Sequence, residues 1–215
     1  MPFDLDHKNN PTHNPNQKYI TQISMLMVAS LMTLPALAHP GHDAPTTVGS
    51  AFMSGALHPY GGLDHILLAV GFGLLMARGI KHGGIYGALT LVASLIVGFA
   101  VSFVMPTSLA SMVEWGILAS VIVTAIALLQ DKRFFALVGV GALAVFHGMA
   151  HGFELPSGAS SLGFASGMVI GMSLLYAVGL IIGHFISDNL PAQAKRHYIV
   201  EKLLAVLGLG ALFLG

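Results

Sequence analysis

The stretch GGIYGALTLVASLIVGFAVSFV, residues 83–104, contains no charged side chain and is long enough to cross a bilayer as a helix. A crossing needs roughly 20 predominantly apolar residues. Comparable apolar stretches follow in the rest of the chain, at residues 61–77, 111–129, 134–153, 161–186 and 199–214. With a mean hydropathy of +0.79, the sequence predicts an all-α, polytopic membrane helix bundle with six transmembrane helices in one domain.

The composition of the 215 residues excludes several classes of function. Nine Lys and Arg balance nine Asp and Glu, so there is no basic field that would favour nucleic acid. No cysteine is present, which excludes disulfides, thiolate metal sites and cysteine-based catalysis. No GxxxxGK[ST] loop is found, so a nucleotide-driven motor is not expected. Histidine, with 11 residues, is the abundant functional side chain.

The N-terminal segment resembles a targeting signal. An apolar stretch at residues 23–34 is followed by Ala36-Leu37-Ala38, a small-x-small cleavage pattern. We expect a signal peptide at 1–38, a periplasmic histidine-containing segment at 39–57, and a six-helix transmembrane domain at 58–215. The polar leader, which contains Asp4 and Asp6, leaves an uncleaved first helix as the alternative.

The distribution of charge predicts the topology. Basic residues fall in every second connection between the apolar stretches: Arg78 and Lys81, Lys132 and Arg133, and Lys195 and Arg196. The connections MPTSLA, 105–110, and LPSGAS, 155–160, carry none. Because basic loops stay in the cytoplasm, we expect a multi-pass protein of the bacterial inner membrane with the mature N-terminus and the C-terminus outside.

Polar residues concentrate in the fourth apolar stretch, at FHGMAHGFE, residues 146–154. His147 and His151 are four residues apart and therefore share one helix face, and Glu154 continues that face. Ionisable groups within spans are costly and are functional candidates by default. We interpret the three residues as cation ligands, or as two ligands held in place by the third.

A second cluster, HPYGGLDH, residues 58–65, precedes and begins the first predicted span. His58 and His65 are candidate ligands. Asp64 is either a ligand, a partner that orients a ligating histidine, or a carboxylate that stabilises a helix N-terminus. Under the predicted topology both clusters lie toward the outer side, so the two can meet.

Weaker candidates lie elsewhere. Glu114 begins the third span on the same side, and His184, near the inner end of span five, is a candidate inner waypoint for the ion. After cleavage the chain would begin with His39 and His42, which we hypothesise capture metal outside. Because Pro40 has no amide N–H, such a complex would be weak and exchangeable.

Small residues form a stripe on the fifth predicted span. The glycines are separated by multiples of four residues and are Gly163, Gly167, Gly171, Gly179 and Gly183. This spacing predicts close helix packing, with a substrate path along the bare backbone as the alternative.

At these two clusters the chain, from about residue 39 to 215, resembles the HupE/UreJ family of bacterial membrane proteins. By resemblance, His58, Asp64 and His65 match the histidine-rich motif of the family's first span, and His147, His151 and Glu154 match that of its fourth. The resemblance implies a secondary permease for nickel, with cobalt next, and a link to hydrogenase or urease maturation.

The expected function is therefore movement of Ni²⁺ or Co²⁺ into the cytoplasm, with the ion as substrate, no prosthetic group and no catalytic residue. Imidazole ligands suit these metals. The alternative is a membrane-embedded zinc-dependent hydrolase using the same histidines, with Ser166 assisting. A third interpretation, bis-histidine haem binding, needs opposed ligands about one haem apart.

Overall fold

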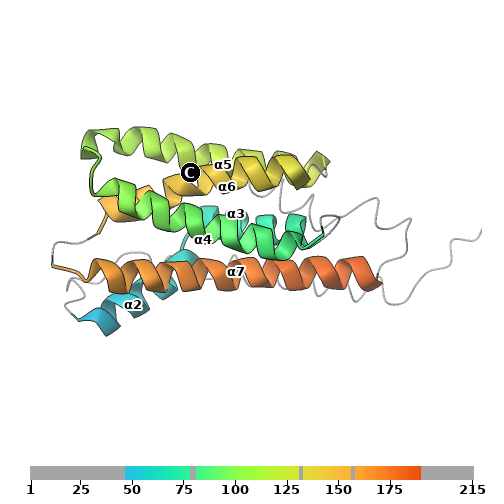
Figure 1. The fold of residues 1–215 in the computed structure, drawn as a ribbon, viewed down its shortest axis with the longest axis horizontal. Helices are drawn as coiled ribbons and strands as arrows, with labels where there is room; N and C mark the ends of the chain where they lie inside the picture. Colours follow the sequence, from blue (N-terminus) through green and yellow to red (C-terminus); the bar gives the residue numbers. More distant parts are fainter. Residues whose placement is uncertain (1–46, 78–80, 131–132, 156–157, 190–215) are drawn as a thin grey trace, which may run out of the picture. The chain divides into compact units, whose positions relative to one another are not determined.

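The computed structural model describes residues 47–77, 81–130, 133–155 and 158–189, and within these ranges the regular elements are all helical. In chain order the elements are α2 (Val48–Leu57), η1 (His58–Tyr60), α3 (Leu63–Met76), α4 (Gly83–Ser102), η2 (Thr107–Leu109), α5 (Ala110–Gln130), α6 (Arg133–Phe153) and α7 (Ser161–Asn189). Figure 1 shows α4, α5, α6 and α7 running side by side. The predicted signal peptide, His39, His42 and the sixth span lie outside the described residues.

Four of these helices are long and apolar enough to cross a membrane, and α2 with α3 forms a fifth candidate if the two are taken as one bent span. The prediction of an all-helical, multi-pass membrane protein is confirmed on these grounds. The number six and the cleavage of the signal peptide stay predictions.

The first predicted span differs from the expectation. The helix predicted over 61–77 is present as the 14-residue α3, but at about 21 Å it is too short to cross a bilayer core of about 30 Å by itself. Helix α2 precedes it, and the two axes differ by 76°. Pro59, at the start of η1, lacks an amide N–H, and Gly62 is extended before α3 begins, so the helical ladder stops between them.

The glycine stripe holds both halves of this bent pair against α7. A Cβ atom at Gly167 would collide with the backbone of Phe52 in α2, and one at Gly179 would collide with the backbone of Val70 in α3. Gly55 and Gly73 make the reciprocal approaches from α2 and α3 to α7. The structure therefore agrees with the helix-packing interpretation of the stripe.

The pair α4 and α6 packs equally closely. Gly98 of α4 lies against the backbone at Val145, and Gly148 of α6 lies against the backbone at Leu95. Without side chains at these positions the two helices approach to backbone contact. This packing fixes the rotation of α6 and so decides which way its histidines face.

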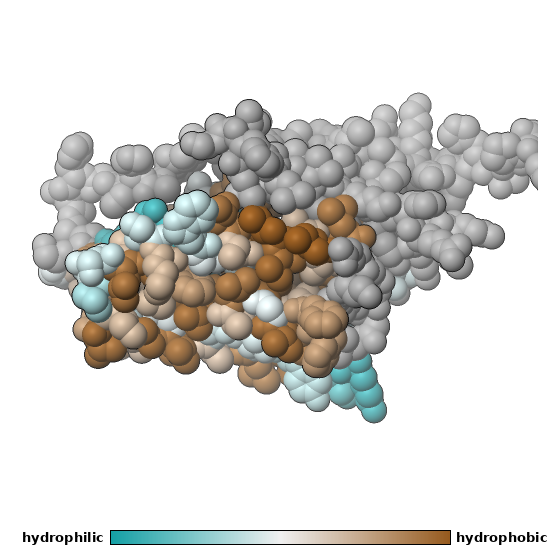
Figure 2. All heavy atoms as spheres, turned by 90° about the horizontal axis from the view of Figure 1, so that it is seen from above, coloured by the Kyte–Doolittle hydropathy of each residue, from teal (hydrophilic) through white to brown (hydrophobic). Residues whose placement is uncertain are grey.

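Helix α3 is the core of the described bundle. Every residue from Leu68 to Met76 is buried, and α3 packs on α5, α6 and α7. Large apolar side chains such as Leu89, Ile96 and Leu174 are exposed on the outer helices. Apolar residues dominate the described surface in Figure 2, as expected for a protein whose outer face contacts lipid.

Candidate metal centre

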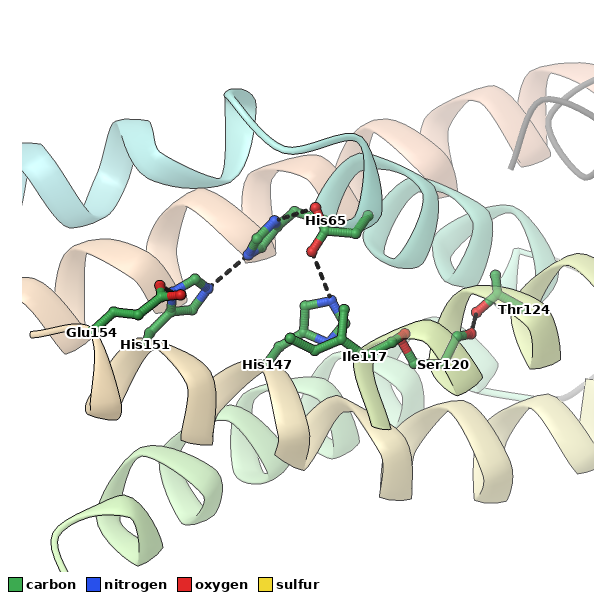
Figure 3. A network of polar contacts seen from close by, with 8 residues as sticks. His65, Ile117, Ser120, Thr124, His147, His151 and Glu154 are labelled. Atoms are coloured by element: carbon green, nitrogen blue, oxygen red, sulfur yellow. Dashed lines mark hydrogen bonds and ion pairs between the residues drawn. The ribbon is translucent and has the colours of Figure 1, made fainter. Parts of the chain in front are cut away.

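Five potential metal ligands converge where the bent pair breaks. His58 comes from η1, and Asp64 and His65 come from the first turn of α3. His147 and His151 come from the last two turns of α6. Figure 3 shows His147 and His151 projecting from α6 toward His65. The two sequence clusters, more than 80 residues apart, therefore meet as the sequence analysis predicts.

His65 lies at the centre of this cluster. Its Nδ1 is 3.0 Å from Oδ1 of Asp64, and its Nε2 is 2.7 Å from Nε2 of His151. The His65 and His151 rings stack with centroids 4.9 Å apart, and the His147 ring meets His65 edge-on at 5.1 Å. His58 completes the arrangement, its ring centroid 4.5 Å from that of His151.

The two histidines of α6 are buried, and three of their four ring nitrogens have no hydrogen-bond partner among the described residues. His147 is 0% exposed and His151 is 4% exposed. Both ring nitrogens of His147 and Nδ1 of His151 have no hydrogen-bond partner among the residues that the structure describes. Because a buried polar group without a partner costs about 1–3 kcal/mol, these nitrogens are suited to a ligand that supplies the missing contact.

Asp64 contacts two of the histidines. While Oδ1 accepts from His65, Oδ2 is 3.5 Å from Nε2 of His147. The carboxylate also stands in the first turn of α3, where it offsets the positive end of the helix dipole, which would otherwise repel a cation. The geometry is therefore compatible with all three roles considered for Asp64.

Glu154 lies at the edge of the cluster, just beyond the end of α6. Its side chain is 68% exposed, and its Oε2 is 3.6 Å from Nδ1 of His151. The neighbouring His151 ring lowers the pKa of the Glu154 carboxyl. Glu154 thus presents a negative charge at the surface beside a buried imidazole.

The donors form two overlapping sets. His58, His65 and His151 offer ligand atoms within 4.8 Å of one another, and so do Asp64, His65 and His147. Either set has the nitrogen and oxygen chemistry of a transition-metal site. Among the described residues, Glu154 belongs to neither set.

Two further candidates lie apart from the cluster. Glu114 is exposed on α5. His184 is exposed on α7, where its Nδ1 lies 2.8 Å from the Leu180 carbonyl oxygen one turn earlier. The structure does not bring either residue to the donors described above, and their proposed roles stay predictions.

Ser120 and Thr124 were not predicted from the sequence as candidate site residues. Both are buried, with 0% and 2% exposure, on α5, which packs on α6, and Figure 3 shows them further along α5 than Ile117. Their hydroxyls donate to the carbonyls of Ile117 and Ser120, which leaves oxygen lone pairs available. The signal in the sequence is a pair of hydroxyl residues four apart on an otherwise apolar helix, which places them on one face.

Comparison with known proteins decides the family. A family model described as HupE / UreJ protein matches residues 26–213. The chain belongs to the HupE/UreJ family. It is also 30% identical over 154 residues to Protein HupE of Rhizobium leguminosarum bv. viciae, covering 69% of this chain and 77% of the relative. No solved structure matches.

Members of the HupE/UreJ family are nickel/cobalt permease-type accessory proteins and not enzymes. This removes the hydrolase alternative, and Ser166 is accordingly exposed with its hydroxyl donating to carbonyls of its own helix. The haem alternative also fails, because His65 and His151 are stacked in direct hydrogen-bonding contact and leave no room for a macrocycle between them.

Proposed function

We propose that this HupE/UreJ protein is a secondary permease that moves a divalent transition-metal ion, nickel first and cobalt next, across the bacterial inner membrane into the cytoplasm. The observation that carries the proposal is the convergence of His58, Asp64, His65, His147 and His151, with buried ring nitrogens that have no hydrogen-bond partner among the described residues. Family membership supports the same role.

The donor chemistry supports the choice of substrate. Imidazole with one carboxylate suits nickel and cobalt, whereas magnesium and calcium prefer oxygen ligands. A transport site must also release its ion. Neutral imidazoles with a single carboxylate bind less permanently than thiolates, and the chain has no cysteine.

The proposed topology puts the cluster on the outer side. We propose that residues 48–76 form a broken first span and that residues 199–214 form the sixth. The break between α2 and α3, whose axes differ by 76°, then carries the donor cluster. Binding sites at broken helices within the membrane recur among secondary transporters.

The membrane potential is a sufficient driving force. An inward-negative potential favours entry of a divalent cation by about 4.6 kcal/mol per 100 mV, twice the value for a single charge. The proposed mechanism therefore needs no nucleotide hydrolysis. Nickel or cobalt that the protein moves into the cytoplasm would be available for hydrogenase or urease maturation, and this is the proposed link to those enzymes.

The test is uptake of Ni²⁺, Co²⁺ and Zn²⁺ by proteoliposomes that contain the purified full chain. We expect nickel and cobalt to enter with an inward-negative potential, and His65→Ala and His147→Ala to reduce uptake more than tenfold. His82→Asn is the matched control, because His82 has a positive φ of 59° that asparagine tolerates, and it lies outside the cluster. Absence of uptake by folded wild-type protein would refute the permease.

The N-terminal tail has a proposed role in capture. His39 and His42, if exposed by cleavage after Ala38, would bind metal outside and pass it to the cluster. A peptide of the mature N-terminus should bind Ni²⁺ more tightly than the same peptide with both histidines replaced by alanine. Equal binding by the two peptides would remove the tail from the mechanism.

A further inference from the structure

The five converging donors do not form one ring of ligands around a point. Two sets of three satisfy the distance requirement, and they have one member in common, His65. His58 and His151 belong only to the first set, and Asp64 and His147 belong only to the second. An ion held by one set leaves two donors of the other set free.

The two nitrogens of the His65 ring face the two sets. Nε2 meets His151 at 2.7 Å, whereas Nδ1 meets Asp64 at 3.0 Å. Since these nitrogens lie on different sides of the imidazole, cations bound to them would lie on different sides of the ring. Figure 3 shows His65 between His151 and His147 in this way.

The two positions also differ in depth. His147 precedes His151 by four residues on α6, a shift of about 6 Å along the helix axis. His151 lies next to the exposed Glu154 at the end of α6, whereas His147 is fully buried. A cation that moves from the first set to the second therefore moves from the mouth of the cluster into the bundle.

The charges of the two sets favour that direction. The first set consists of three imidazoles, and the second contains the Asp64 carboxylate, which attracts a divalent cation more strongly. Two divalent ions on opposite sides of one imidazole would repel each other strongly in a site removed from water. One ion at a time is therefore the occupied state.

We propose that a single divalent cation occupies two adjacent positions in turn, first at His58, His65 and His151 and then at Asp64, His65 and His147, with His65 binding the ion through Nε2 in the first position and through Nδ1 in the second. This inference rests on the proposed permease function. It gives the two clusters of the sequence different tasks: His58 and His151 capture the ion, and Asp64 and His147 receive it.

The experiment measures Co²⁺ binding to the purified full chain in detergent by visible absorption, which reports the ligands around the ion, together with Co²⁺ uptake into vesicles. Every protein in this experiment carries His39→Ala and His42→Ala, which remove the proposed capture site of the N-terminal tail, and we expect this parent chain to bind one Co²⁺. His58→Ala leaves only the second position complete and His147→Ala leaves only the first, so each variant should bind one Co²⁺ with its own absorption spectrum. Both should lose uptake more than tenfold, and His65→Ala should lose binding as well.

Three outcomes would overturn the two-position arrangement. Loss of all binding in both His58→Ala and His147→Ala means one position with shared ligands. Identical spectra of these two variants mean the same, and two Co²⁺ bound to one parent chain without His39 and His42 mean independent sites. The variants His58→Gln and His147→Gln, checked for monodisperse elution, ensure that lost binding is not lost folding. Wild-type protein that binds Co²⁺ but moves none into vesicles refutes the permease function instead.

Discussion

Gly62, the residue before α3, is a glycine because a side chain there would collide with Asp64 and His65. Its backbone, with φ of −111° and ψ of 125°, suits any residue. However, a Cβ atom added there would lie 2.5 Å from Nδ1 of His65 and 2.6 Å from Oδ1 of Asp64. The absence of a side chain therefore leaves room for the hydrogen bond between these two residues.

Replacing Gly62 with alanine should disturb the centre without disturbing the fold. The added methyl group displaces the Asp64–His65 pair, and a misplaced partner of a metal ligand typically costs 10–100-fold in affinity. We expect Gly62→Ala to weaken Co²⁺ binding by about this factor. Gly49→Ala, at a glycine with open space around it, is the matched control and should bind as the wild type does. Titration of both proteins in detergent checks this, and an unchanged affinity in Gly62→Ala would contradict it.

The repeat of His-Gly in FHGMAHGFE has a residue-level explanation. Adjacent helical residues point about 100° apart, so each histidine faces α3 while the glycine after it faces α4. Gly148 lies against Leu95, and Gly152 lies against Ser102. The shared face of His147 and His151 was predictable from their spacing. The function of the two glycines was not, because it depends on which helix packs behind α6.

At the scale of elements, the close packing of α4 on α6 holds the two α6 histidines in place. A Cβ atom at Gly148 would lie 2.2 Å from the carbonyl oxygen of Leu95, and backbone atoms cannot move aside as a side chain can. Gly139, on the same helix, would meet only the Cγ1 atom of Val123 at 3.3 Å. The two positions thus form a natural pair for comparison.

Gly148→Ala should destabilise the protein by about 1–3 kcal/mol, the usual cost of overpacking. Gly139→Ala should change stability much less, because the side chain of Val123 can adjust. Thermal unfolding in detergent, followed by the fluorescence of the single tryptophan, Trp115, measures the difference. Equal unfolding temperatures for the two variants would show that α4 and α6 are not in backbone contact at Gly148.

The broken first helix separates what was predictable at this scale from what was not. The apolar composition predicted a helix over 61–77, and α3 lies within that range. Helix α2 was not predicted as a partner of α7, because ten residues are too few to indicate a span and their neighbours are polar. Its position depends on the glycines of α7, which are distant in sequence.

At the scale of the whole molecule, the described bundle is closed beyond the donor cluster. Phe72, Leu74 and Leu75 of α3 are fully buried in it, so an ion that continues past His147 meets tightly packed apolar side chains. Thr124 is the next buried hydroxyl on that side, and its methyl group would contact a Cβ at Gly71. A route from the cluster to His184, the predicted inner waypoint, would have to pass these side chains.

Removing the hydroxyls of α5 should therefore slow transport and spare binding. Ser120→Ala and Thr124→Val each remove one buried oxygen contact, worth about 1 kcal/mol or fivefold in rate. We expect Co²⁺ uptake to fall by about that factor while Co²⁺ affinity in detergent is unchanged. Ser166→Ala, which removes an exposed hydroxyl with the same kind of backbone bond, is the control. Uptake at the wild-type rate in both α5 variants would show that the ion does not pass the hydroxyls of Ser120 and Thr124.

The architecture as a whole was predictable in outline, because hydrophobic length and the alternation of basic connections are properties of the sequence alone. The meeting of the two histidine clusters was predictable too, since both fall on the same side of the predicted topology. Which donors share an ion was not predictable, because that depends on ring orientations set by α4 and α7.

The exposed carboxylate of Glu154 has a consequence for the kinetics of capture. A negative charge at the mouth of a low-dielectric site raises the local concentration of cations and so their association rate, and dissolved salt screens this attraction. Glu154→Gln should slow Co²⁺ association by up to about tenfold at low ionic strength, with the rates of the two proteins converging as salt is added. Stopped-flow mixing over a range of salt concentrations tests this. The abundance of other ions outside the cell would then set how fast the protein collects a scarce metal.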